Sequence, residues 1–102
     1  HPAVIRLLRD IVTASRAANV PLSVCGEMAA GREGALLLFG LGYREFSMAP
    51  SSIAAVRDAL SAYRVDEIEG AVGSATRAEP LTPSSFAAAL PRPSQNHCED
   101  QP

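Results

Sequence analysis

The sequence has no lysine, only two cysteines and only five aromatic residues (three Phe, two Tyr), and these shortages exclude several classes of protein. Nine arginines against eleven acidic residues give a formal net charge of -2, with no basic cluster for nucleic acid. The two thiols, Cys25 and Cys98, do not make the disulfide framework of a small secreted domain, and no metal-ligand spacing surrounds them apart from the adjacent His97-Cys98. No apolar run is long enough to span a membrane and no signal peptide is visible, so we expect a cytoplasmic protein.

What is present is a short apolar chain of 102 residues, 47% hydrophobic and 20% charged, which predicts one globular domain or less. Much of the apolar content is alanine, which buries little area, so we expect a thin core. The chain begins at His1 rather than Met, and we interpret it as part of a longer polypeptide.

Helical and strand-like spacing alternate along the chain. Helical spacing predicts a helix over 3–18 that ends at Asn19, with an apolar face formed by Val4, Leu7, Leu8, Ile11, Ala14 and Ala18. Short strands are predicted at 21–25 and 44–48, on either side of a buried helix over 33–41 that Gly40 and Gly42 close.

Three further helices follow the second strand. The first begins at Pro50 and has a buried stripe of Ile53, Val56, Leu60 and Tyr63. The second opens at Asp66, at capping-box spacing from Glu69. The third, over 84–90, follows Thr82 as its N-cap, and residues 91–102 are predicted to form a disordered tail.

This order of elements predicts an α/β fold with parallel strands and a right-handed crossover. Two parallel strands form a poor sheet alone, because parallel sheets normally need cover on both faces. The chain is therefore expected either to belong to something larger or to oligomerise.

Cys25 stands at the end of the first predicted strand, between Val24 and Gly26. The carboxyl ends of parallel strands are where α/β proteins bind ligands, so a thiol there can act as a nucleophile or as a proton donor. A nucleophilic cysteine usually has a histidine base nearby, whereas the histidines here, His1 and His97, are both terminal. The alternative is that Cys25 is a small buried core residue.

Three other candidate residues each have a functional and a structural interpretation. Glu27 either orients a ligand or stabilises a helix N-terminus. Ser51 and Ser52 either offer amides to an anion or cap the helix after the second strand. The nine arginines are dispersed along the sequence and are predicted to lie on solvated helix faces.

Four segments of the chain follow one another in a recognisable order, namely His1-Pro2-Ala3-Val4, Cys25-Gly26-Glu27-Met28-Ala29, Leu36-Leu37-Leu38-Phe39-Gly40-Leu41-Gly42 and Glu45-Phe46-Ser47-Met48-Ala49-Pro50-Ser51-Ser52-Ile53. In order and spacing they resemble the C-terminal end of Enzyme I, the phosphoenolpyruvate-protein phosphotransferase of the bacterial sugar phosphotransferase system, and its nitrogen-related paralogue. The resemblance runs from His1 to about Leu60. One departure is Ala30-Gly31, where the family usually has Gly-Asp.

The resemblance implies the last two strand-helix units of a (β/α)8 TIM barrel with extra C-terminal helices, so that residues 1–90 form part of a phosphoenolpyruvate-binding domain. The family binds phosphoenolpyruvate and Mg2+, passes the phosphoryl group to a protein histidine and releases pyruvate. Cys25 matches the cysteine that protonates C3 of the enolate, and Gly26 and Glu27 would line the substrate site. The Mg2+ ligands and the phospho-acceptor histidine would lie upstream of His1.

By this resemblance the chain is expected to be inactive alone and to meet a phosphocarrier protein only through its parent enzyme. A homo-oligomer is expected. The alternatives are a non-catalytic dimerisation module derived from the barrel and a small thiol-dependent enzyme.

Overall fold

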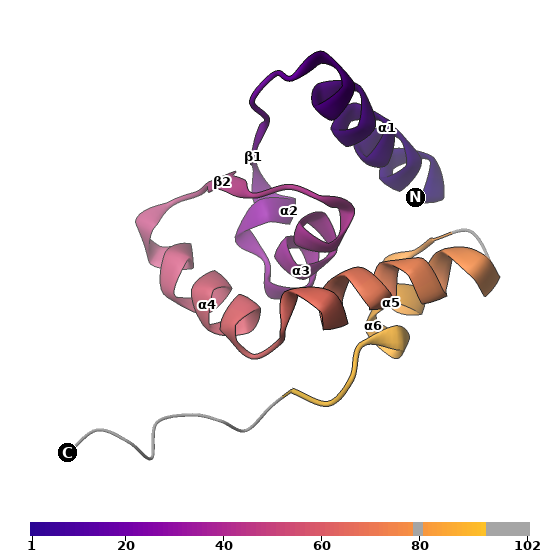
Figure 1. Ribbon diagram of the computed structural model, residues 1–102. Helices are drawn as coiled ribbons and strands as arrows, with labels where there is room; N and C mark the ends of the chain where they lie inside the picture. The colour runs from indigo at the N-terminus through magenta and orange to yellow at the C-terminus, as the bar shows by residue number, and fades with distance from the viewer. Residues whose placement is uncertain (79–80, 94–102) are drawn as a thin grey trace.

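The computed structural model describes residues 1–78 and 81–93, which form a helix-rich α/β arrangement (Figure 1). The helices are α1 (Pro2–Ala18), α2 (Glu27–Ala30), α3 (Arg32–Leu41), α4 (Pro50–Ser61), α5 (Val65–Ala78) and α6 (Pro83–Ala89), and the strands are β1 (Ser23–Cys25) and β2 (Glu45–Ser47). Most of the tail predicted at 91–102 lies outside the described residues.

The two strands pair in parallel, as predicted, and α3 lies in the connection between them. Their register places Cys25 opposite Ser47 at the carboxyl ends. Each strand has three residues, two fewer than predicted. In the first strand, the two predicted residues that are not part of β1 both precede Ser23. Pro21 is one of them, and proline has no N–H to offer a ladder.

The sheet has one covered face and one bare face, because successive strand residues point to opposite sides. Val24 and Phe46 are half-buried and pack against the core on the covered face. The bare face carries Ser23, Cys25, Glu45 and Ser47, all exposed.

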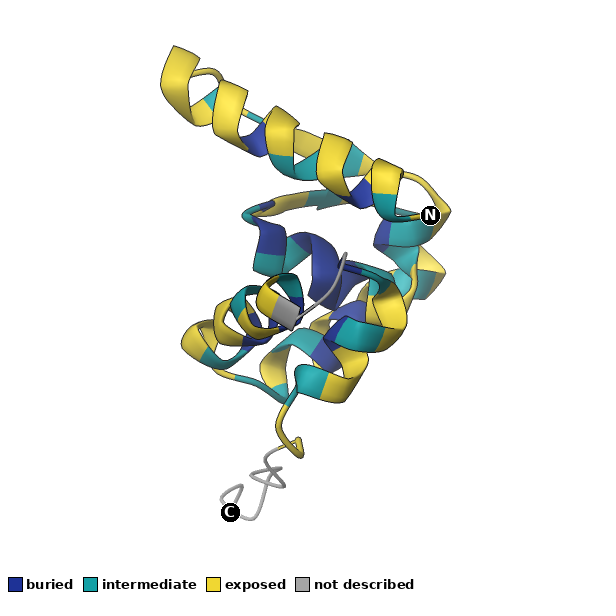
Figure 2. Ribbon diagram, turned by 90° about the vertical axis from the view of Figure 1, so that its right-hand side faces the viewer, coloured by how far each residue is buried: buried dark blue, intermediate teal, exposed yellow. Residues whose placement is uncertain are grey.

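Helix α3 is the centre of the core, as its apolar composition predicted. Five of its residues are buried, namely Ala35, Leu36, Leu37, Leu38 and Leu41. Helices α1, α2, α4, α5 and α6 all contact it, and the buried segments gather in the middle of the molecule (Figure 2). The core therefore depends on several helices approaching one short helix.

Two glycines make this close approach possible. A Cβ on Gly34 would collide with the backbone carbonyl of Met28 in α2, and a Cβ on Gly40 would lie 2.6 Å from the Val72 side chain in α5. The predicted end of the helix at Leu41 is confirmed, and of the two glycines predicted to close it only Gly42 is the C-cap, whereas Gly40 lies inside the last turn. Gly42 does end it, with a φ of 121° that side chains rarely adopt.

Of the predicted apolar face of helix α1, only Leu8 packs against the core, and an adjacent row is buried instead. Ile5 and Val12 are buried and Leu8 is half-buried, whereas the predicted residues Leu7 and Ile11 are exposed. The helix has two adjacent apolar rows, and only the Ile5–Val12 row faces the core. The Tyr43 hydroxyl ties α1 in place by donating a hydrogen bond to the Leu8 carbonyl at 2.9 Å.

Helix α4 buries only part of its predicted stripe. Val56 is buried, and Leu60 and Tyr63 are half-buried. Ile53 is exposed instead, because it lies where a hollow opens between α4 and β2 and so lacks neighbours on one side.

The structure confirms some of the helix caps that the sequence predicts. Asn19 ends α1 in the left-handed conformation, and Thr82 caps α6 in a reciprocal capping box with Ser85. Ser51 and Ser52 do not cap α4, whose N-cap is Ala49 without any side-chain hydrogen bond.

The capping box predicted from Asp66 to Glu69 is wrong. Helix α5 begins at Val65, and the Glu67 carboxylate accepts the Arg64 backbone N–H at 2.7 Å. Asp66 instead pairs with the Arg64 guanidinium at 3.1 Å, and this hydrogen bond lowers the pKa of Asp66. On the inner side of this helix, Ile68, Ala71 and Ala75 are buried and Val72 is half-buried.

Gly34→Ala tests the close approach of α2 to α3. The added methyl collides with the Met28 carbonyl, so we expect a loss of about 1–3 kcal/mol in the free energy of unfolding measured with urea. Gly70→Ala is the matched control, because Gly70 is helical with open space around it and alanine there should gain about 0.5–1 kcal/mol. Equal stabilities of the two variants would contradict this role of Gly34.

Tyr43→Phe tests the link between α1 and the core. Loss of the bond to the Leu8 carbonyl should cost about 1 kcal/mol at neutral pH. Burial raises the pKa of Tyr43, so the fold favours the neutral phenol and wild-type stability should fall as pH rises beyond about 10. This alkaline decline should be smaller in Tyr43→Phe, and it is easily seen because the chain has no lysine. A decline of the same size in wild type and in Tyr43→Phe would contradict this role of the phenol.

Candidate active site

The turn between β1 and α2 places the thiol. Gly26 follows Cys25 with a φ of 107°, a conformation that favours glycine, and its carbonyl accepts the backbone N–H groups of Ala29 and Ala30. The chain thus leaves the strand directly after Cys25 and enters a four-residue helix. Sequence reasoning missed α2, because one turn of helix is too short to show periodicity.

Cys25 is exposed, which contradicts the alternative that it is a buried core residue. It lies on the bare face of the sheet, where Ser47 is its neighbour in the register. Within the described residues no hydrogen bond to its thiol is formed, and the His1 ring nitrogen Nδ1 accepts the Ala3 backbone N–H at 3.2 Å as the α1 cap. In the structure His1 thus caps α1, while His97 lies outside the described residues.

A groove of about 530 Å3 lies where the strands end and α2 and α4 begin. It is lined by Gly26, Glu27, Ala30, Gly31, Met48, Ala49 and Ser52. Three of these residues, Gly26, Glu27 and Ser52, are candidates from the sequence, and the fold brings them together from two separate loops. Cys25 is not among the lining residues, although it immediately precedes Gly26.

Glu27 is the first residue of α2 and is exposed. A carboxylate in a first turn interacts favourably with the helix dipole, so the position of Glu27 agrees with its predicted role of stabilising a helix N-terminus. Its contact with the groove leaves the carboxylate accessible to a ligand as well. The ligand-binding roles of Gly26 and Glu27 stay predictions.

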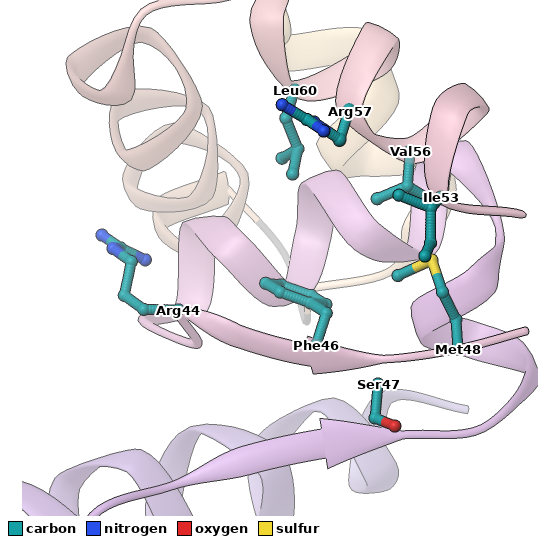
Figure 3. Close-up of a pocket in the computed structure, with 8 residues that line it drawn as sticks. All are labelled: Arg44, Phe46, Ser47, Met48, Ile53, Val56, Arg57 and Leu60. Atoms are coloured by element: carbon teal, nitrogen blue, oxygen red, sulfur yellow. The ribbon is translucent and has the colours of Figure 1, made fainter. Parts of the chain in front are cut away.

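A second hollow, of about 440 Å3, lies between β2 and α4 (Figure 3). Its apolar lining includes Phe46, Val56 and Leu60, and Figure 3 shows Phe46 and Ser47 on opposite sides of β2. This hollow is therefore on the covered side of the sheet, away from the bare face that carries Cys25.

Arg44 borders the second hollow but is already engaged. Its guanidinium pairs with Glu69 at 2.8 Å, lies 3.9 Å from the centre of the Phe39 ring and donates to the Phe39 carbonyl at 2.7 Å. These contacts fasten the start of β2 to α3 and α5. The prediction of solvated helix faces is confirmed for five of the nine arginines: Arg9 is half-buried, and the exposed Arg44, Arg64 and Arg92 lie outside the helices.

The described residues include no cluster of three or more His, Cys, Asp or Glu side chains that could hold a metal ion. No helix in the described part of the chain combines the length and apolarity needed to cross a membrane.

The comparisons with known proteins place the chain in a family. Residues 1–65 match the family model of the PEP-utilising enzymes, PEP-binding domain, where PEP is phosphoenolpyruvate. The chain belongs to this family. The match covers β1, α2, α3, β2 and α4, and thus both loops of the groove. The sequence resemblance to Enzyme I is confirmed at this level.

Curated relatives carry names that agree with the family. The chain is 37% identical over 90 residues to a phosphoenolpyruvate-protein phosphotransferase of Cupriavidus necator, a match of 88% of this chain and 15% of that protein. It is 38% identical over 69 residues to the protein of the same name from Borreliella burgdorferi, covering 68% of this chain and 12% of that protein.

A third relative, the multiphosphoryl transfer protein of Xanthomonas campestris, is 44% identical over 57 residues, which are 56% of this chain and 7% of that protein. The chain thus spans a small part of the length of these relatives. No solved structure gives a significant match to the chain.

Alkylation tests the exposure of the thiol. In a Cys98→Ser variant, Cys25 should react with iodoacetamide in the folded protein at a rate close to that in urea, because its side chain is solvent-exposed. A thiol moved into the core, in Cys25→Ala/Cys98→Ser/Ala35→Cys, should be protected, since Ala35 is fully buried. Equal protection of the thiols in these two variants would mean that Cys25 is buried after all.

Proposed function

We propose that this chain is part of a phosphoenolpyruvate-protein phosphotransferase, and that Cys25 is its proton donor. The observation that carries the proposal is an exposed thiol at the carboxyl end of a parallel strand, within the segment that matches the PEP-binding domain. The names of the relatives support the same activity.

In the proposed reaction the bond between phosphorus and the enol oxygen of phosphoenolpyruvate breaks. The phosphoryl group goes to a histidine of the complete protein, and the electrons of that bond remain as the enolate of pyruvate. The Cys25 thiol then gives its proton to C3 of the enolate, which forms a C–H bond and completes pyruvate. The thiolate takes a proton from water before the next cycle.

In that reaction this chain would supply the proton and position the thiol that carries it. Gly26 turns the backbone so that Cys25 remains at the very end of β1, and the Cys25–Ser47 register places the thiol beside the second strand end. An acid needs no histidine base, which suits the surroundings of this thiol. Gly26 and Glu27 are proposed to contact the substrate from the groove that they line.

A (β/α)8 barrel is the architecture that we propose for the complete domain. Its interior would be lined by the bare face of the sheet, and its helical layer would include α1, α3 and α4. The one-sided burial of β1 and β2 supports this arrangement, because barrel strands point alternate residues toward helices and toward the interior.

Mg2+, which the family resemblance implies, has no fitting site among the described residues, since their carboxylates form no ligand cluster. The ligands would belong to the rest of the complete enzyme. The chain alone is therefore proposed to be inactive, and a phosphocarrier protein is proposed as a partner of the complete enzyme only.

Cys25→Ala in a complete enzyme that carries this segment tests the assignment. Pyruvate formation from phosphoenolpyruvate should fall by about 10²–10⁴-fold, the usual contribution of a general acid, while the affinity for phosphoenolpyruvate changes little. Cys98→Ser is the matched control and should retain turnover. Unchanged turnover in Cys25→Ala would remove Cys25 from the mechanism, and pyruvate release by the isolated chain would refute its proposed inactivity.

A non-catalytic interaction module is the second candidate function. It is favoured by exposed apolar residues on α1, which form a surface suited to another protein segment.

A further inference from the structure

Ser47 is the residue of β2 that pairs with Cys25 on the last rung of the parallel ladder. Both residues are exposed and belong to the bare face of the sheet, and Figure 3 shows the Ser47 side chain on the side of β2 opposite Phe46. Paired residues on neighbouring strands stand about 5 Å apart, and their side chains point to the same face. This rung therefore carries a thiol and a hydroxyl within reach of each other.

The Ser47 hydroxyl is free to serve the thiol. In the part of the chain that the structure describes, no hydrogen bond engages it. Ser23 is the other serine of the bare face, but it pairs with Glu45 at the opposite end of the three-rung ladder. Ser47 is thus the hydroxyl next to the thiol, and Ser23 is the distant one.

The charges near the thiol make a hydrogen-bond donor useful. Glu27 opens α2 directly after the turn at Gly26, and Glu45 lies on the bare face two residues before Ser47. No cationic side chain belongs to the bare face of the described strands. When a thiol gives up its proton, negative charge develops on sulfur, and neighbouring carboxylates disfavour that charge. A hydroxyl that donates to the sulfur offsets this cost.

The contact is one that strengthens only as the reaction proceeds. A neutral thiol is a weak acceptor, and within the described residues Cys25 and Ser47 form no hydrogen bond. A thiolate is a much stronger acceptor, because it carries a full charge. An interaction that is weak in the ground state and strong in the transition state lowers the barrier, whereas one of equal strength in both does not.

We propose that Ser47 is a positioning residue for the proton donor, and that its hydroxyl donates a hydrogen bond to the Cys25 sulfur as the thiol becomes a thiolate. The S–H bond of Cys25 breaks, a C–H bond forms at C3 of the enolate, and the O–H bond of Ser47 stays intact and points at the sulfur. The inference rests on the proposed phosphotransferase function and adds one residue to it.

Ser47→Ala in the complete enzyme that carries this segment tests the inference. Hydrogen bonds to charged groups are strong, so kcat for pyruvate formation should fall about 10–100-fold, while KM for phosphoenolpyruvate changes less than about twofold. Ser47→Thr keeps the hydroxyl and should retain most of the turnover. Ser23→Ala is the matched control, because it removes the same group from the far end of the same face and should leave kcat unchanged.

A double variant tests whether Ser47 acts through the thiol. Without the sulfur the hydroxyl has no charge to stabilise, so adding Ser47→Ala to Cys25→Ala should change kcat by less than about twofold. Urea unfolding of the Ser47→Ala chain checks the fold, and its midpoint should match that of wild type because Ser47 is exposed.

Three results would overturn the inference and leave the role of Cys25 standing. The first is full turnover in Ser47→Ala, or a loss in Ser47→Thr as large as in Ser47→Ala. The second is a raised KM with unchanged kcat, which would mean that Ser47 contacts the substrate. The third is additive losses in the double variant. Full turnover in Cys25→Ala is a different result, because it would remove the proposed function and the role of Ser47 with it.

Discussion

The close approach of neighbouring helices to α3 is the constraint on which the rest of this structure depends. The chain has few aromatic side chains and much alanine, so it cannot fill wide gaps between its elements. It closes the distance instead at Gly34 and Gly40, where no Cβ separates α3 from α2 and α5. Because α3 lies between β1 and β2 in the chain, its position also determines how the two strand ends meet.

The candidate site follows from that arrangement. Packing of α3 on one side of the sheet turns Val24 and Phe46 inward, and the alternation of strand residues then leaves Cys25 and Ser47 on the bare side. Gly26 ends the strand at the thiol. The structure therefore places an accessible thiol next to the groove residue Gly26, and the family match covers both.

Helix α1 has two apolar rows. The row with Ile5 and Val12 completes the core, and the adjacent row with Leu7 and Ile11 faces outward. A helix that is apolar over so wide an arc is typical of an element with neighbours on two sides. The described part of the chain provides one of these neighbours.

The sequence by itself determined every element except α2, the parallel pairing, the place of Cys25 at a strand end and the family, because periodicity, turn residues and motif spacing are properties of neighbouring residues. Only the tertiary structure decided which row of α1 is buried, that Gly40 serves packing, and that Cys25 is exposed. It also showed that α5 starts directly after Arg64 rather than at Asp66. Burial and close approach depend on which surfaces meet across the fold. In a helix with two apolar rows, or in a short strand, the local sequence pattern does not decide which side faces the core.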